Sequence, residues 1–547
     1  MRWFSLFFFL GSVALAQESD PVYVALEGGD LYTVTKGTLR GATVLLKNDK
    51  IHRIGMDLVL PKGTTRYDVS GKRVLPGFVA VESYGLGVSG SGTLSDSLDP
   101  YDENIKLALA SGITSAFVDP RGSGGFFGFR FRSSGSSNIV VKMSYGDLEG
   151  MTLLEPGSVN LTGWVNAPPS GRYQIREKFE KAKKVIQKVA DYEKRRAGNK
   201  LKKGEKAPST GSLDSYIKLL KGETIARMSA RTAPQIQDAL ELINDYRFRC
   251  ILTGVVEGWT LADKIGRSGA YCILTPRDRV AVDENINRLN GSSIEQAAIL
   301  HKAGVRFSII TLDGGVSIGG IAGRDLMNLP LEAAFTVRGG LDEETALASI
   351  TITAAEMLGV SDQIGSIEVG KDADLIVLDG NPFDYRTFVD LTFVNGKLLY
   401  NKAKSSYFSH IPSRGGDVKV VGTVTKTKPS EKKNTEKNDP DPISGTWSGV
   451  MVIPAFKIKS AFSVTLTLKE GKVTGAVTTV MNKRKMVQPV AGTFDGTNLK
   501  IQGTQQGSSY SITMKLVGPN HLKGVWSAIM GKQKVSGPVE CRRKSGK

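Results

Sequence analysis

The sequence predicts an α/β fold built on a parallel sheet, followed by a separate all-β module. Between residues 75 and 358, short apolar runs alternate with stretches of helical periodicity, which is typical of strands joined by crossover helices. Over residues 442–545, alternating strands follow one another at hairpin spacing, as in a small barrel or sandwich. A stretch rich in Lys, Ser, Thr, Pro and Asn separates the two patterns. We therefore expect a solvated linker over residues 404–441.

Residues 1–16 fit a secretory signal peptide. Arg2 precedes a short apolar run that ends in Ala14-Leu15-Ala16, the small-residue pattern of a cleavage site. The run is too short for a transmembrane helix, and no later stretch is long and apolar enough to form one. We expect a periplasmic or secreted protein with no transmembrane segment. An uncleaved membrane anchor is the alternative.

Seven strand candidates stand in the α/β region, and the spacing leaves room for an eighth near residues 153–164. The seven candidates are 75–81, 115–118, 138–142, 225–228, 250–253, 271–274 and 305–311. Helical periodicity occurs at 234–246, 293–303 and 342–358. Short alternating strands flank this region on both sides, within residues 22–76 and 360–403.

A basic amphipathic helix interrupts the strand pattern. Between Gly171 and Lys206 there are fourteen Lys and Arg against five Asp and Glu, in a chain of formal net charge +18. A solvated helix face is the simplest interpretation, and attraction to an acidic surface or polymer is the alternative. Nucleic acid is not expected as a partner, because no aromatic residues are interleaved for base stacking and the chain is predicted to be exported.

Two further features bear on function. Cys250 and Cys272 begin consecutive strand candidates, so they could pair or remain buried thiols, while three cysteines in all are too few for a disulfide framework. Glycine-rich stretches at 121–129 and 314–320 follow strand candidates. Neither ends in the Lys-Ser or Lys-Thr of a phosphate-binding loop, so both are expected to be turns at the ligand face.

Three motifs resemble those of the amidohydrolase superfamily, in particular secreted imidazolonepropionase-like and dipeptidase-like members. They are Val74-Leu75-Pro76-Gly77-Phe78, Thr353-Ala354-Ala355-Glu356-Met357-Leu358-Gly359 and Gly370-Lys371-Asp372-Ala373-Asp374-Leu375. The resemblance covers about residues 30–403. It implies an eight-stranded (β/α) TIM-like barrel over residues 77–359 and a composite β-sandwich formed by residues 22–76 and 360–403. It also implies hydrolysis of C–N bonds with zinc or another divalent metal.

The metal-binding residues of that family are mostly missing from this chain. In the family, a His-x-His pair follows the first motif, and here Glu82 and Tyr84 stand in those positions. Ser229 and Gly254 stand where further histidines are expected, and only Asp313 matches the family aspartate that serves as ligand and general base. The chain has four histidines, and none follows a strand-like apolar run as a metal ligand at a barrel end should: His52, His301, His410 and His521. We expect no catalytic metal or other cofactor.

Three functional hypotheses follow. The first is a pseudoenzyme that keeps the barrel for binding or assembly, with an active amidohydrolase paralogue as partner or with a small-molecule or peptide ligand. The second is an active C–N bond hydrolase with a rearranged centre, in which Asp313 is the base and Glu82 holds a water or cation. In the third, the carboxy-terminal β module is the binding part. It carries no cluster of acids, histidines or cysteines that would suggest catalysis.

Overall fold

The chain folds into two compact units, Met1–Lys428 and Pro429–Lys547. The computed structural model describes residues 20–88, 97–118, 138–155, 157–202, 204–317, 324–424, 443–453, 458–469, 472–481, 484–505, 508–518, 520–530 and 533–543. The predicted signal peptide, the glycine-rich stretch 121–129 and residues 425–441 of the predicted linker lie outside these ranges. Within them, no helix is long and apolar enough to cross a membrane.

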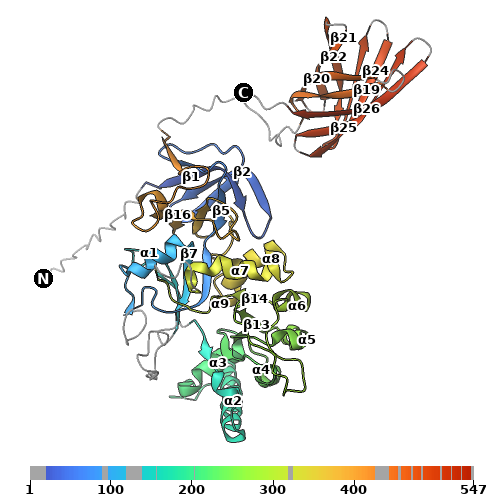
Figure 1. The fold of residues 1–547 in the computed structure, drawn as a ribbon. Helices are drawn as coiled ribbons and strands as arrows, with labels where there is room; N and C mark the ends of the chain where they lie inside the picture. The colour runs from blue at the N-terminus through green and yellow to red at the C-terminus, as the bar shows by residue number, and fades with distance from the viewer. Residues whose placement is uncertain are drawn as a thin grey trace, which may run out of the picture. The chain divides into compact units, whose positions relative to one another are not determined.

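Nine strands of the first unit form two adjoining sheets around one hydrophobic core (Figure 1). A four-stranded sheet contains β6 (Phe78–Ser83), β7 (Ile113–Val118), β8 (Ile139–Lys142) and β9 (Thr152–Leu154). A five-stranded parallel sheet contains β10 (Val159–Asn160), β11 (Ala226–Ser229), β12 (Cys250–Thr253), β13 (Tyr271–Leu274) and β14 (Phe307–Ile309). The backbone N–H of Tyr84 donates to the carbonyl of Gly314 at 3.1 Å, which links the chain after β6 to the chain after β14.

Strand orientation differs in one place from the expected parallel arrangement. β6 and β7 are parallel, but β8 runs antiparallel to β7 and β9 antiparallel to β8. The apolar pattern of β8 fits either direction, since all four of its residues are buried. A strand in the predicted window near residues 153–164 is confirmed, because β10 lies there and pairs in parallel with β11.

Helices cover the strands of the first unit. They are α1 (Glu103–Ala110), α2 (Pro169–Ala197), α3 (Asp214–Lys221), α4 (Ala233–Tyr246), α5 (Ala262–Ser268), α6 (Gln296–Lys302), α7 (Leu329–Arg338), α8 (Glu343–Ser349) and α9 (Ile352–Leu358). A capping box between Thr232 and Gln235 begins α4. The single helix predicted over 342–358 was wrong: the chain breaks at Ile350-Thr351, where the Ile350 carbonyl accepts the Val79 N–H at 2.9 Å.

The two flanks of the α/β region share one nine-stranded sheet with its own core. It contains β1 (Tyr23–Tyr32), β2 (Thr38–Lys47), β3 (Lys50–Gly55), β4 (Thr65–Asp68), β5 (Arg73–Pro76), β15 (Leu375–Leu378), β16 (Val389–Val394), β17 (Lys397–Asn401) and β18 (Lys419–Thr423). β5 and β15 pair antiparallel and so join the two flanks. The sandwich arrangement of these flanks stays a prediction.

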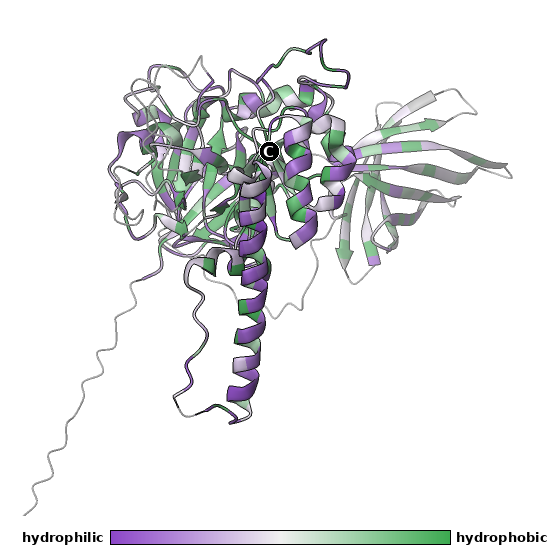
Figure 2. Cartoon of the chain, turned by 90° about the horizontal axis from the view of Figure 1, so that it is seen from below, coloured by the Kyte–Doolittle hydropathy of each residue, from purple (hydrophilic) through white to green (hydrophobic). Residues whose placement is uncertain are grey.

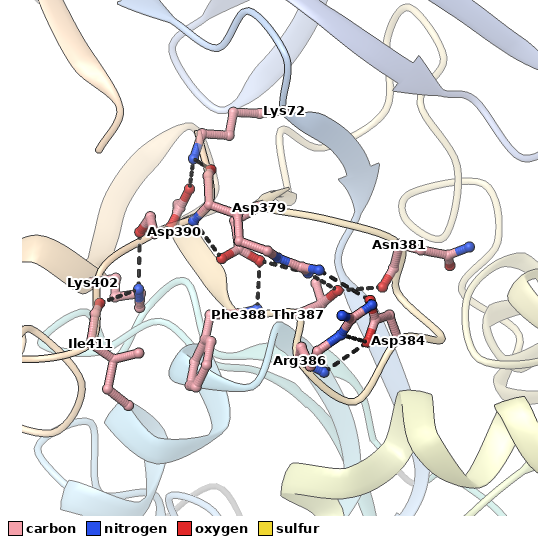
Figure 3. A network of polar contacts seen from close by, with 12 residues as sticks. Lys72, Asp379, Asn381, Asp384, Arg386, Thr387, Phe388, Asp390, Lys402 and Ile411 are labelled. Carbon is pink, nitrogen blue, oxygen red and sulfur yellow. Dashed lines mark hydrogen bonds and ion pairs between the residues drawn. The ribbon is translucent and has the colours of Figure 1, made fainter. Parts of the chain in front are cut away.

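Part of the predicted linker belongs to this sheet, so the prediction that the linker starts at residue 404 was wrong. β18 pairs antiparallel with β4. Upstream of β18, the buried ammonium of Lys72 donates to the carbonyls of Arg414 at 2.7 Å and Gly416 at 2.6 Å, and to Asp390 at 2.7 Å (Figure 3). Buried Lys402 donates to the Ile411 carbonyl at 2.7 Å. Lys72 and Lys402 therefore hold residues 411–416 against the first unit, although the polar composition of this segment predicts a solvated linker.

A second charged cluster connects the flank sheet to β8. Lys142, only 3% exposed, lies 2.5 Å from Asp372 and 3.0 Å from Asp374, and it donates to the Asn395 side chain at 2.5 Å. Asp372 also accepts from Lys50 of β3. The Lys371-Asp372-Ala373-Asp374 motif is therefore part of the contact between the two parts of the unit.

The second unit is a closed eight-stranded antiparallel barrel, as the small barrel or sandwich prediction allowed (Figure 1). Its strands are β19 (Gly445–Ile453), β20 (Ile458–Lys469), β21 (Lys472–Met481), β22 (Arg484–Phe494), β23 (Asn498–Gln505), β24 (Ser508–Gly518), β25 (His521–Met530) and β26 (Gln533–Arg543). Pairing of β19 with β26 closes the barrel. Trp447, Val464 and Ile512 are among the buried residues of its core.

Candidate functional site

The predicted site residues stand at the carboxyl ends of strands in the first unit. Glu82 lies in β6 and Tyr84 follows that strand, while Asp313 follows β14. Ser229 ends β11 and Gly254 follows β12. Loops at this end of parallel strands form the ligand face in (β/α) barrels, so these residues share one region, which we call the mouth.

Tyr84 and Asp313 are in direct contact. The Tyr84 hydroxyl donates to Asp313 Oδ1, which also accepts the backbone N–H of Gly315 at 3.0 Å. The Tyr84 ring lies so close to Gly315 that a Cβ on this glycine would be 3.0 Å from Cε2 of the ring. Burial and the hydrogen bond to Asp313 raise the pKa of Tyr84 to about 12. Tyr84 is thus a neutral donor at physiological pH, and Asp313 is its acceptor.

Glu82 forms an ion pair with Arg227 of β11. Arg227 Nη2 lies 2.6 Å from Glu82 Oε1 and 3.2 Å from the carbonyl oxygen of Val81. The guanidinium carbon stands 4.2 Å from the centre of the Phe117 ring, in a cation–π contact. The Arg227 side chain is 10% exposed and that of Glu82 is 38% exposed. A fixed cation is therefore bound to Glu82, the carboxylate for which the resemblance predicts the first metal-ligand position.

Ser229 and Gly254 take no part in these contacts. The backbone N–H of Ser229 donates to Thr162 Oγ1 at 3.1 Å, and the residue is exposed. Gly254 has φ +67°, which a histidine would adopt only with strain. A Cβ added at Gly254 would meet the Arg231 side chain at 3.6 Å, and Arg231 pairs with Asp278 at 2.8 Å.

Comparison with known proteins identifies the family of the first unit. The amidohydrolase family model matches residues 237–399. The 5'-deoxyadenosine deaminase of Methanobrevibacter smithii is 25% identical over 400 residues, which cover 66% of this chain and 89% of that protein. The chain belongs to the amidohydrolase superfamily.

Other members of the superfamily match shorter segments or the fold alone. A 5-methylthioadenosine/S-adenosylhomocysteine deaminase of Teredinibacter turnerae is 34% identical over 127 residues, which cover 22% of this chain and 26% of that protein. The crystal structure of an amidohydrolase from Thermotoga maritima superposes with a TM-score of 0.55 at 23% identity, covering 69% of this chain and all of that one. This likeness supports the TIM-like barrel predicted for the first unit.

The residues at the mouth do not fit the metal that membership of the superfamily implies. Zinc in proteins is held mainly by histidine and cysteine, with carboxylates as additional ligands. The four histidines lie on β3, α6, β25 and the segment after β17, and none lies in the mouth. Glu82 is bound by Arg227 and Asp313 by Tyr84. Among the described residues, no group of three or more His, Cys, Asp or Glu is placed to hold a metal ion.

Two further carboxylates, Glu257 after β12 and Glu332 of α7, are also held by arginines. Glu257 is bound by Arg288 at 2.7 Å and by the backbone N–H groups of Ala233 and Gly291. Burial opposes ionisation of Glu257, but these donors hold its pKa below the usual range. Glu332 is fully buried and accepts from Nε and from the backbone N–H of Arg277, both at 2.6 Å. Arginine–carboxylate pairing is thus the common feature of this end of the unit.

Sequence reasoning identified Glu82, Tyr84 and Asp313 but missed Arg227, the partner of Glu82. The signal for Arg227 was present: a charged residue within the apolar run 225–228, two positions before Ser229 and hence on the same face of the strand. The structure also decides between paired and free cysteines. Cys250, Cys272 and Cys541 are free and buried, and burial raises the pKa of the Cys272 thiol to about 12.

Proposed function

We propose that this member of the amidohydrolase superfamily is a binding or assembly protein and does not carry out metal-dependent hydrolysis. The observation that carries the proposal is the Arg227–Glu82 ion pair at 2.6 Å, next to the Tyr84–Asp313 contact. A guanidinium can neutralise a carboxylate, but it cannot act as the Lewis acid that lowers the pKa of a bound water.

The alternative of an active hydrolase needs Asp313 and Glu82 to be free for chemistry. A general base must reach the proton that it removes. In this chain the Asp313 carboxylate accepts from the Tyr84 hydroxyl and from Gly315, and Glu82 faces a buried arginine. Each carboxylate therefore already shares one oxygen with a donor of the chain, and Arg227 neutralises the charge that would hold a cation at Glu82. The contacts therefore favour the binding role.

The partner that we propose is a metal-bearing amidohydrolase of the same cell, met outside the cytoplasm after export. A chain that keeps its fold without the metal ligands retains surfaces that can pair with those of a related subunit in a near-symmetric dimer. The other possible binding function is recognition of a small molecule or peptide at the mouth. The second unit is a candidate for binding either the partner protein or such a ligand.

Elemental analysis of the full chain tests the central claim. After growth with zinc, manganese and iron supplied, we expect far less than one transition metal ion per chain, because imidazole and thiolate donors are absent from the mouth. Glu82→Gln and Asp313→Asn should leave this content unchanged. A near-stoichiometric metal that either variant removes would overturn the proposal and favour an active hydrolase.

Affinity purification from the native host tests the partner. We expect a second amidohydrolase to be recovered with the full chain at physiological salt. The same experiment with a chain ending at Lys428 tells whether the second unit makes the contact. If the chain is recovered alone in both forms, the proposed amidohydrolase partner is wrong. Binding of a small molecule or peptide at the mouth then becomes the preferred function.

A further inference from the structure

Helix α2 continues well beyond the residues that anchor it. It spans 29 residues, about 43 Å at the rise of an α-helix, and only Phe179 and Ala182 are buried. The anchor lies in its first half, where Phe179 stacks on Tyr246 at 4.3 Å and Arg176 pairs with Glu241 at 2.7 Å. Figure 2 shows the rest of the helix extending away from the body of the unit, with a mostly hydrophilic surface. We call residues 183–206 the basic arm.

The basic arm carries far more positive charge than its own contacts neutralise. It holds ten Lys and Arg against three Asp and Glu. Lys183 pairs with Glu180 at 3.1 Å and Arg195 with Glu205 at 2.6 Å. Seven exposed cations of the arm form no ion pair with any residue that the structure describes: Lys184, Lys188, Lys194, Arg196, Lys200, Lys202 and Lys206.

The part of this charge that lies before the last turn does not stabilise the helix. Lys184 and Lys188 are four residues apart, and like charges at that spacing destabilise a helix. Only the basic residues of the last turn, Lys194, Arg195 and Arg196, complement the helix dipole. Lys184 and Lys188 therefore gain nothing from each other on the helix, whereas an opposite charge on a partner would neutralise them.

We propose that the basic arm binds an anionic lipid surface. Six of the seven unpaired cations are lysines, which act as compact point charges, and clusters of four to eight basic residues on an amphipathic helix are typical of anionic lipid binding. Val185, Ile186, Val189 and Tyr192 lie between them and are only partly buried, so they can contact the boundary of the acyl chains. Single-stranded nucleic acid binding would favour several exposed aromatic side chains, and the one tyrosine of the arm is half-buried.

Vesicle co-sedimentation of the full chain tests the proposal. The probes are vesicles of phosphatidylcholine alone and of phosphatidylcholine with phosphatidylglycerol, each at low and at high salt. We expect binding to the anionic vesicles only, and loss of that binding at high salt. The variant Lys184→Gln/Lys188→Gln/Lys194→Gln/Lys200→Gln should bind at least roughly 100-fold more weakly, because each lysine near an anionic surface contributes to binding.

A matched control variant separates the effect of the basic arm on binding from the effect of the net charge of the chain. Lys47→Gln/Lys62→Gln/Lys264→Gln/Lys302→Gln removes four exposed lysines elsewhere on the first unit and should keep the affinity within a few fold. An equal loss in both variants would overturn the proposal, as would equal binding to the two kinds of vesicle. Tighter binding to single-stranded RNA than to anionic vesicles would overturn it in favour of nucleic acid. A helical circular dichroism spectrum equal to that of the unmodified chain excludes unfolding as the cause.

Discussion

Two charged sites of the first unit, the buried cluster around Lys142 and the Arg227–Glu82 pair at the mouth, use similar groups in different surroundings. Lys142, Asp372 and Asp374 are each at most 7% exposed, whereas Glu82 is 38% exposed. The first site joins β8 to the flank sheet, so its charges have no access to water if a partner is lost. Glu82 does have that access. The comparison separates a structural use of charge from one that leaves a carboxylate available at a surface.

The largest expected effect is at the buried cluster. Lys142→Met leaves Asp372 and Asp374 side by side with only Lys50 to balance them, and breaking a buried ion pair typically costs about 3–5 kcal/mol. Chemical denaturation of the first unit measures the loss. Lys397→Met is the control, because Lys397 is 64% exposed in its pair with Asp147 and should cost less than about 1 kcal/mol. Equal losses in both variants would show that the cluster is not structural.

A smaller effect is expected at the mouth. Arg227→Met should lower the free energy of unfolding by about 1.5–3 kcal/mol, the range for a lost hydrogen bond to a charged group. The loss is smaller than at the buried cluster because water can solvate Glu82. The double variant Arg227→Met/Glu82→Gln should recover part of this loss. Denaturant unfolding of the unmodified chain, the two single variants Arg227→Met and Glu82→Gln, and the double variant gives the coupling free energy between the two residues. A coupling near zero would mean that the pair does not hold the mouth together.

The Tyr84–Asp313 contact should produce a pH dependence rather than a large loss at neutral pH. The folded chain keeps the Tyr84 proton because its pKa is raised to about 12, whereas an unfolded tyrosine titrates near pH 10. The resulting stabilisation is present below about pH 10 and is lost as pH rises through about 12. Unfolding between pH 9 and 12 should therefore be less pH-dependent in Tyr84→Phe than in the unmodified chain. Tyr173→Phe, at a residue 68% exposed, should keep the original pH profile.

The smallest effect is expected from removing the second unit. Limited proteolysis should cut first between residues 424 and 443, where composition predicts a solvated linker, and release the β-barrel. Because both charged sites lie in Met1–Lys428, the effects of Lys142→Met and Arg227→Met should be the same in the cut and uncut protein. A single cooperative unfolding transition without protease-resistant fragments would contradict independent units.

Much of the architecture could be predicted because it depends on local pattern. Helix α4 has a capping signal and regular apolar spacing, and the closed β-barrel has alternating strands. The break at Ile350 coincides with a hydrogen bond from the distant Val79, and the direction of β8 appears only in its antiparallel pairing with β7 and β9. Periodicity contains neither of these contacts. At the site, missing histidines could be counted from the sequence. The pairing of Glu82 with Arg227 could not, because the two residues are 145 positions apart.

Closure of the second unit limits how it can meet other molecules. Each of its eight strands is hydrogen-bonded to a neighbour on both sides, so the described strands leave no free edge onto which a foreign strand could be added. Such a module resists edge-to-edge aggregation even at high local concentration. Any recognition by this unit must therefore use side chains on its outer wall or at its ends, where specificity depends on shape and chemistry and not on the exposed backbone.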